Sequence, residues 1–333
     1  MKKSLIALAV LTASGISFAQ STITIKGTFD PSFVSQKSTY GNGNSVTQTG
    51  LQNNRQGTSQ ITFLGTEDLG GGLKANFLYE GDFNATQQAG SGNAIGDGGG
   101  EVFVGLSGGF GSLKLGAPNT PSLTAQTAST PFGTKIGSGF GAMNAGHVRS
   151  SNSIRYDTPS FSGFTAAVLV ANKTKADTNP STAVAAVADS TDIGLFYANG
   201  PLAAGVSFWK TSGLAGAADN KETNAYVSYD LGVAKVGAGM FTEETGTTVD
   251  SSAYNLSVAA PMGAVTLMGN YARKNDKTAA NKDRTVTALG AKYDLSKRTS
   301  IYARVVNDKI DNETTATTAY KNAYTLVGVQ HNF

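Results

Sequence analysis

The stretch AYTLVGVQHNF, residues 323–333, reads as a strand that runs to the last residue of the sequence. Side chains of a strand point alternately to its two faces, so Thr325, Val327, Val329, His331 and Phe333 share one face. An open strand edge invites pairing with other chains. Closing the sheet into a barrel removes that edge, because the last strand then pairs with the first. The stretch therefore predicts a closed β-barrel.

Alternation with a period of two residues recurs along the whole chain. In residues 22–30, for example, Ile23, Ile25 and Phe29 face one way and polar residues face the other. The sequence predicts sixteen strands, at residues 22–30, 60–68, 73–80, 101–107, 112–116, 149–157, 164–172, 192–198, 202–210, 222–230, 233–243, 252–259, 264–273, 284–294, 299–308 and 320–333.

The connections between these strands alternate between short and long. Short turns on one side of a membrane and long loops on the other are typical of a transmembrane barrel. No stretch after residue 19 approaches the roughly 18 consecutive apolar residues of a membrane-spanning helix, and only helices and closed barrels satisfy their backbone in lipid. We expect loops over residues 31–57, 81–100, 117–147, 173–190 and 309–319.

The first residues have the pattern of a secretory signal. Lys2 and Lys3 precede a short apolar run, and Ser17-Phe18-Ala19 is a small-x-small cleavage site. We expect residues 1–19 to be a cleaved signal peptide and residues 20–333 to be a single transmembrane barrel domain. An exported protein of this kind is expected in a membrane outside the cytoplasm.

The composition agrees with an exported barrel. The chain has 41 Gly, 8 Pro and no Cys, so no disulfide framework is available. Loss of Lys2 and Lys3 would leave 24 basic residues of the 26, against 23 acidic ones. This near balance gives no indication of nucleic-acid binding.

Four segments carry a resemblance to a known family. They are GTEDLGGGLKANFLYEGDF (65–83), EVFVGLSGGFGSLKLG (101–116), SSNSIRYDTPSFSGFTAAV (150–168) and VGVQHNF (327–333). In this order they resemble the general-diffusion porins of Gram-negative bacteria, the trimeric kind found in β-proteobacteria. The resemblance covers the chain from residue 20 onward.

The resemblance implies a 16-stranded antiparallel barrel in the outer membrane of a Gram-negative bacterium. It implies a homotrimer in contact with outer-membrane lipid, with a third loop folded into the lumen as a constriction. It also implies that the outer-membrane assembly machinery reads Phe333. The expected function is passive diffusion of small hydrophilic solutes and inorganic ions through a water-filled channel.

The third loop is also suggested by its own residues. Residues 117–147 form one of the longest connections and carry Pro118, Pro121 and Pro131 followed by several glycines. Proline stiffens a loop, and glycine allows sharp turns in a confined space. A functional role is a common reason for such a length.

The chain departs from the family pattern at positions where relatives often carry basic residues. Gln60 and Leu64 stand on the second predicted strand, Ala117 stands at the foot of the third loop, and Glu101 stands at the start of the fourth strand. These departures weaken the expectation of a strong electric field across the constriction of the pore.

Residues 117–147 contain no Asp or Glu, and their single Lys is Lys135. Because selectivity follows the charges near the narrowest point, we expect a weak preference for anions. The alternative for each of these charged residues is that it lies in the lumen, in contact with water and away from the constriction, and has no effect on selectivity. The candidate pore-lining residues are Lys26, Gln60, Lys74, Glu101, Lys114, Lys135, Arg149 and Arg155.

Aromatic residues stand near several strand ends. They are expected to form girdles at the membrane interfaces, and ordinary strand propensity is the alternative. These residues are Tyr79, Tyr156, Tyr197, Trp209, Tyr226, Tyr229, Tyr293 and Tyr302.

The sequence offers little for catalysis. It has no Cys and two His, His147 and His331, and no nucleophile–base–acid motif or metal-ligand spacing. The glycine runs at 96–100 and 137–141 lack the context of a phosphate loop. We expect no enzyme activity, cofactor or metal. The rival interpretations are a substrate-specific channel on the same barrel, a structural or adhesive barrel with a plugged lumen, and a barrel hydrolase.

Overall fold

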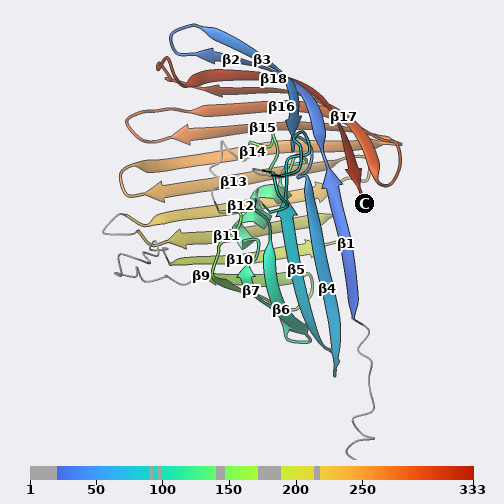
Figure 1. Cartoon of the computed structure of the whole chain (residues 1–333). Coiled ribbons are helices and arrows are strands. Elements are labelled where there is room, and N and C mark those ends of the chain that lie inside the picture. Colours follow the sequence, from blue (N-terminus) through green and yellow to red (C-terminus); the bar gives the residue numbers. More distant parts are fainter. Residues whose placement is uncertain (1–20, 91–92, 97–98, 140–146, 172–188, 214–217) are drawn as a thin grey trace, which may run out of the picture.

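In the computed structural model, the chain forms one sheet in which every strand pairing is antiparallel (Figure 1). The structure describes residues 21–90, 93–96, 99–139, 147–171, 189–213 and 218–333. The expected signal at 1–19 and nearly all of the expected loop at 173–190 lie outside these residues. No helix in the described part is long and apolar enough to cross a membrane.

The strands are β1 (Thr22–Phe29), β2 (Pro31–Tyr40), β3 (Ser45–Asn53), β4 (Gln60–Gly70), β5 (Leu73–Asp82), β6 (Val102–Gly108), β7 (Gly111–Ala117), β8 (Ser153–Asp157), β9 (Phe164–Ala171), β10 (Ser190–Asn199), β11 (Leu202–Thr211), β12 (Asn220–Asp230), β13 (Lys235–Thr245), β14 (Val249–Met262), β15 (Val265–Asp276), β16 (Arg284–Asp294), β17 (Thr299–Ile310) and β18 (Ala319–Asn332). The described helix is α2 (Pro121–Ala128).

The first four strands are two long strands, each with a break. Strand β1 pairs with β4, and β2, which continues β1 after Asp30, pairs with β3. If β1 and β2 are counted as one barrel strand and β3 and β4 as another, the eighteen described strands become sixteen, which confirms the predicted count. The ring is complete, because β9 pairs with β10, and β18 pairs with both β1 and β2.

The expected loop at 31–57 is therefore wrong over most of its length. Residues 31–40 and 45–53 form the β2–β3 hairpin, which lies beside β18 at the top of Figure 1. These segments are rich in Ser, Thr and Gln, so their hydrophobic alternation is weak and the ladder hydrogen bonds decide their conformation.

The break between β1 and β2 is held by Asp30, which is fully buried. Its carboxylate accepts hydrogen bonds from the backbone N–H groups of Gln56 (2.6 Å) and Gly57 (2.8 Å), in the segment that joins β3 to β4. The hydroxyl of Tyr302 donates to the other carboxylate oxygen. The next residue, Pro31, has no N–H to donate to a ladder. One acidic side chain thus fixes both breaks.

The barrel closes where the end of the chain meets β1. The N–H of Gly27 donates to the carbonyl of Phe333 (3.2 Å), and the N–H of Phe333 donates back (3.1 Å). A Cβ at residue 27 would lie 2.6 Å from the carbonyl oxygen of Gln60 and would overlap the Phe333 ring, so only glycine admits the ring there. Most of β18 pairs with β2, so the expected pairing with residues 22–30 is limited to its last residues.

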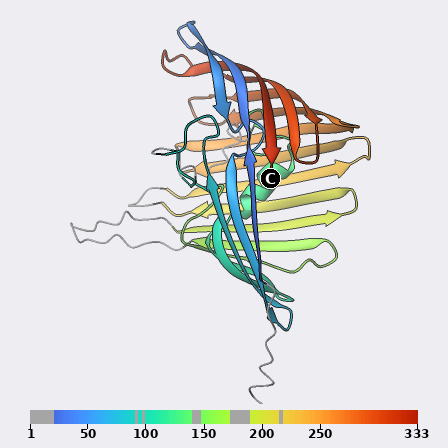
Figure 2. The ribbon, with the colours of Figure 1, turned by 45° about the vertical axis from the view of Figure 1, so that its right-hand side comes forward.

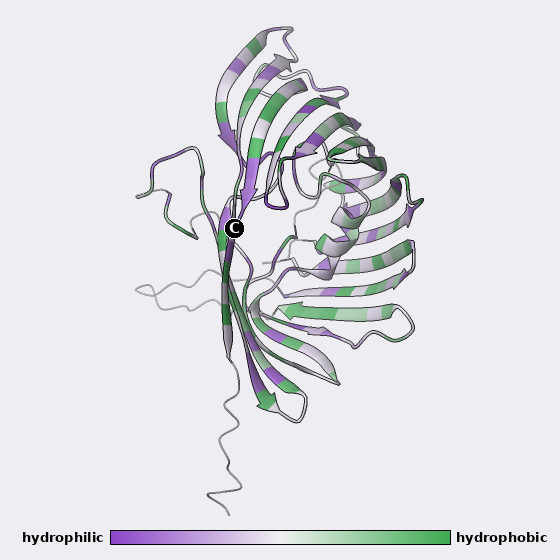
Figure 3. Cartoon of the chain, turned by 90° about the vertical axis from the view of Figure 1, so that its right-hand side faces the viewer, coloured by the Kyte–Doolittle hydropathy of each residue, from purple (hydrophilic) through white to green (hydrophobic). Residues whose placement is uncertain are grey.

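The outer face of the barrel is apolar. Ile23 (71% exposed), Ile25 (57%) and Val327 (55%) point outward, as the alternation predicts. Figure 3 shows hydrophobic and hydrophilic residues alternating along the strands. Single chains in water rarely expose so much apolar surface, so this face suits lipid or another subunit.

The girdle prediction is wrong for three of its eight residues. Trp209 (3% exposed) and Tyr302 (2%) are buried, because their neighbours Phe208 and Ile301 take the outward positions. Tyr226 lies on the inner face of β12 with Asn224, because Val227 takes the outward position. Tyr79, Tyr229 and Tyr293 are exposed and point outward. Proximity to a strand end does not decide the face of a residue, whereas its parity along the strand does.

Deleting Phe333 should lower the amount of barrel that assembles in the outer membrane. The deletion removes both hydrogen bonds to Gly27 and the ring that covers it, while the interior is unchanged. Membrane fractionation and single-channel conductance would measure the two effects, with Phe333→Tyr as the control that keeps the ring. Normal assembly of the deletion variant with an altered conductance would refute this role.

Candidate functional site

A segment between β7 and β8 lies inside the barrel. Residues 118–139 and His147 are termed the inner loop here. Its helix α2 begins at Thr120, whose hydroxyl accepts the N–H of Leu123 (3.1 Å), and Pro121 suits the first helical turn. Figures 1 and 2 show α2 within the ring of strands, against β10–β13.

Polar side chains on the inner face of the wall hold the helical part of the inner loop. Asp192 on β10 accepts hydrogen bonds from the N–H (2.7 Å) and the hydroxyl (2.8 Å) of Ser122. Asn224 on β12 accepts one from the side chain of Gln126 (3.1 Å). All four residues are buried, so each contact satisfies groups that water does not reach.

The segment after α2 is held in the same way. Asn255 on β14 donates to the carbonyl of Ser129 (2.9 Å) and accepts from its hydroxyl (2.8 Å). Asn270 on β15 donates to the carbonyls of Gly137 and Ser138, both at 3.0 Å. With Asp192, these two residues satisfy backbone groups of the inner loop that would otherwise be costly to bury.

Two glycines of β13 let the inner loop approach the wall. A Cβ on Gly237 would lie 2.7 Å from the carbonyl oxygen of Ser129, and one on Gly239 would lie 2.6 Å from its hydroxyl. Any side chain at these positions would push the loop toward the centre of the lumen.

Arg304 on β17 ties the tip of the inner loop to the opposite part of the ring. Its guanidinium lies 4.0 Å from the centre of the Phe132 ring and donates to the carbonyls of Ile136 and Arg55. It also donates to the side chain of Gln56. Arg304 is 2% exposed and forms no ion pair with a described residue, so its role is to connect backbone segments.

Lys135 extends from the inner loop to Thr58, in the segment that joins β3 to β4. Burial lowers the pKa of Lys135, and the nearby carboxylates of Asp82 and Asp30 oppose this and favour its charged form. The loop thus crosses part of the lumen and carries a positive charge to its far side.

The wall beside this crossing carries Gln60, Glu80, Glu101 and Arg149. The side chain of Gln60 donates to Glu80 (2.6 Å), and the N–H of Glu101 donates to the other oxygen of Glu80 (3.4 Å). Arg149 lies 3.8 Å from Glu80. Two acids and one arginine therefore share this part of the pore lining.

Asn119 connects these groups to the base of the inner loop. Its N–H (3.0 Å) and side-chain amide (3.1 Å) donate to Glu101. Its own oxygens accept from Arg149 (3.3 Å) and Arg155 (2.6 Å). Arg155 in turn pairs with Asp157 at 2.6 Å, and Lys114 lies 3.4 Å from the same carboxylate.

Six of the eight candidate pore-lining residues thus belong to the inner loop or to the wall next to it. The other two lie elsewhere. Lys74 is exposed and pairs in register with Asp68 next to the β4–β5 turn, far from the inner loop. Lys26 is exposed on β1 opposite Thr62 and forms no ion pair with a described residue.

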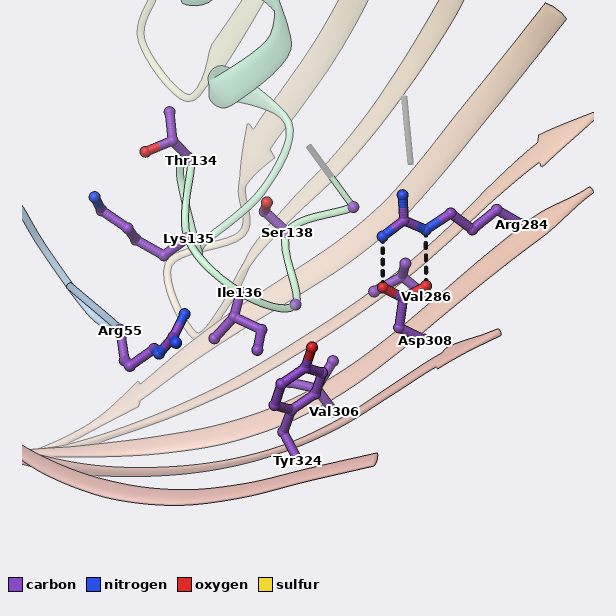
Figure 4. A pocket seen from close by; sticks show the side chains of 12 residues that line it. Arg55, Thr134, Lys135, Ile136, Ser138, Arg284, Val286, Val306, Asp308 and Tyr324 are labelled. Atoms are coloured by element: carbon purple, nitrogen blue, oxygen red, sulfur yellow. Dashed lines mark hydrogen bonds and ion pairs between the residues drawn. The ribbon is translucent and has the colours of Figure 1, made fainter. Parts of the chain in front are cut away.

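Sequence reasoning missed several charged residues of the lumen. Glu80, Arg284 and Arg304 point inward, and their parity along β5, β16 and β17 could have revealed this. Arg55 could not have been found this way, because the 54–59 segment has no strand period. Arg55 and Arg284 line a cavity of about 250 Å³ between the inner loop and the wall (Figure 4).

His147 fixes the end of the inner loop against the wall. Its ring stacks on Trp209 (4.2 Å between centroids), and its Nε2 lies 3.0 Å from Glu222, which is buried. Burial opposes protonation, but the contacts with Glu222 and Asn220 outweigh it and raise the pKa of His147. No group of described residues has the arrangement of a metal site.

Comparison with known proteins identifies relatives along the chain. The family model described as Gram-negative porin matches residues 4–313. Outer membrane porin protein 32 of Delftia acidovorans is 34% identical, and the alignment spans 100% of both chains. Major outer membrane protein P.IB of Neisseria meningitidis serogroup B is 30% identical over 90% of this chain and 91% of the relative.

A solved structure has the same fold. The anion-selective porin from Comamonas acidovorans superposes with a TM-score of 0.77 and 28% identity, over 94% of this chain and 100% of that one.

Asn270→Ala should loosen the tip of the inner loop. It leaves the carbonyls of Gly137 and Ser138 without their donor, at a cost of about 1–3 kcal/mol. We expect noisier single-channel currents and lower resistance of the loop to protease. Asn307→Ala removes the same amide from the exposed face of β17 and should change neither. Equal noise in the two variants would contradict the anchoring role.

The His147–Glu222 contact should make stability depend on pH. Because the pKa of His147 in the folded protein lies above its ordinary 6.5, the contribution is full below about pH 6.5 and is lost as pH rises through the raised pKa. Asp192, Glu243 and its partner Lys274 are the other charged groups nearby.

Thermal unfolding of the wild type and His147→Gln at pH 6 and pH 9 would measure this effect. The unfolding temperature of the wild type should exceed that of His147→Gln by more at pH 6 than at pH 9. His331→Gln is the matched control, since His331 is exposed and its ring forms a hydrogen bond with the hydroxyl of Thr299 rather than with an acid. The same difference at both pH values would count against the ion pair.

Proposed function

This chain belongs to the Gram-negative porin family, and we propose that its channel passes small hydrophilic solutes with a weak preference for anions. The channel lies in the outer membrane and works by passive diffusion. Its barrel provides a hydrated path, and the inner loop narrows that path on one side. Diffusion through such a channel requires no catalytic group.

The observation that carries the anion preference is Lys135. It brings a positive charge into the lumen on a loop whose sequence, residues 117–147, has no acid. Arg55, next to it, forms no ion pair with a described residue. Charges near the narrowest point of a channel set the sign of its selectivity. The similar porin from Comamonas acidovorans is anion-selective, which agrees with this sign.

The preference should be weak, because most other charges near the inner loop are balanced. Asp157 pairs with both Lys114 and Arg155, and Glu80 lies beside Arg149. Asp30 and Asp82 also oppose Lys135. Paired charges create little net potential at the centre of a water-filled pore.

We also propose that the channel is a homotrimer. Ile23, Phe77 and Val104 border a shallow apolar depression of about 300 Å³ on the outward face of β1 and β4–β6. This wall is suited to packing against another subunit, and lipid would cover the rest of the apolar face.

Lys135→Gln should lower the permeability ratio of chloride to potassium by up to about fivefold. One unit charge about 8 Å from the ion is worth about 0.5 kcal/mol in water, favouring chloride and disfavouring potassium, so the ratio changes by about 1 kcal/mol. Reversal potentials of purified channels in a planar bilayer under a KCl gradient would measure the ratio. Lys74→Gln removes the same charge far from the inner loop and should leave the ratio unchanged. Cation selectivity of the wild type would overturn the proposal.

Liposome swelling separates general diffusion from its rivals. Sugars of equal size should enter at similar rates, whereas a substrate-specific channel would favour one of them. Absence of both swelling and conductance would indicate a plugged structural barrel.

A further inference from the structure

The cavity between the inner loop and strands β16–β18 has two chemically different sides. Its volume is about 250 Å³, room for on the order of eight water molecules. Figure 4 shows Arg55 on one side, the Arg284–Asp308 pair on another, and Ile136, Val306 and Tyr324 between them. Such a combination of charge and apolar surface is typical of sites for small organic molecules.

Arg55 is the cation of this cavity that a ligand could pair with. Its side chain has one hydrogen-bond partner among the described residues, the neutral side chain of Gln52. Its Nε is buried without any described partner. Arg284, in contrast, is held by both oxygens of Asp308 at 2.8 and 2.6 Å. The guanidinium of Arg55 points toward the cavity (Figure 4).

The floor of the cavity is apolar and rigid. Val286 and Val306 belong to a buried cluster that also contains Phe132, and Ile136 and Tyr324 pack against it. Ile136 is fixed in place because its carbonyl accepts a hydrogen bond from Arg304. A hydrocarbon group lying on this floor would leave water, which is favourable.

We propose that this cavity is a subsite for small organic monoanions. The carboxylate of the ligand pairs with Arg55, with Lys135 adding positive potential, and its hydrocarbon part lies on the half-buried side chains of Ile136 and Tyr324. The inference rests on the proposed anion preference and adds to it a class of solute. Occupancy must be brief, since conduction requires that a ligand can also leave.

Inhibition of chloride current by short carboxylates tests the subsite. Acetate and butyrate carry the same charge, but butyrate has two more methylenes. If each is half buried, butyrate should inhibit at about fourfold lower concentration than acetate, which corresponds to about 0.8 kcal/mol. Equal inhibition by the two anions would refute the apolar half of the site.

Two variants separate the two halves of the site. Arg55→Gln should weaken inhibition by both carboxylates at least threefold. Ile136→Thr, which puts a hydroxyl on the apolar side of the cavity, should remove the difference between butyrate and acetate while leaving inhibition by acetate intact. Unchanged resistance of the inner loop to protease in each variant would establish that the loop is still in place. Inhibition that persists in both variants would overturn the proposal.

The control variant and the reversal potential separate this inference from the proposed function. Acetate and butyrate should inhibit the chloride current of the Lys74→Gln channel as strongly as that of the wild type. If the KCl reversal potential shows an anion preference but butyrate and acetate inhibit equally, the channel function stands and the subsite fails. If the reversal potential shows cation selectivity, the proposed function fails first.

Discussion

Hydrogen bonds between the inner loop and the wall are the interaction on which the pore depends. An irregular backbone inside a barrel has no ladder of its own, so its N–H and C=O groups need partners from the wall. Asp192, Asn255 and Asn270 provide them from three different strands, and Asn224 on a fourth strand holds the side chain of Gln126. Without these contacts the loop would have no defined distance from the opposite wall, and the lumen would have no defined width.

Closure of the sheet sets where those side chains stand. The pairing of Phe333 with Gly27 completes the ring, and Asp30 holds the two breaks beside it together. Because side chains alternate between the two faces, the register of each strand decides which residues reach the lumen. A shift of one residue in β14 or β15 would turn Asn255 or Asn270 outward and release the inner loop.

The electrostatics of the pore follow from the same geometry. Lys114 and Arg155 converge on Asp157, so they contribute little field to the lumen. Lys135 and Arg55 sit where the inner loop meets the 54–59 segment, and neither forms an ion pair with a described residue. Two residues from distant parts of the chain therefore bring positive charges without an ion pair to the same part of the lumen.

Much of the barrel could be predicted from the sequence, because strand alternation is a local property. The sixteen strands, the outward face of Phe333 and the third loop between residues 117 and 147 all follow from patterns a few residues long. The prediction fails for residues 31–57 because their polar side chains conceal the alternation. It fails for Trp209, Tyr226 and Tyr302 because parity along the strand, and not distance from its end, decides which face a side chain takes. The partners of Lys114, Arg149 and Arg155, the role of Arg304 and the cavity beside Arg55 were decided only by the tertiary structure. They join segments far apart in the sequence, and only barrel closure and the anchoring of the inner loop bring those segments together.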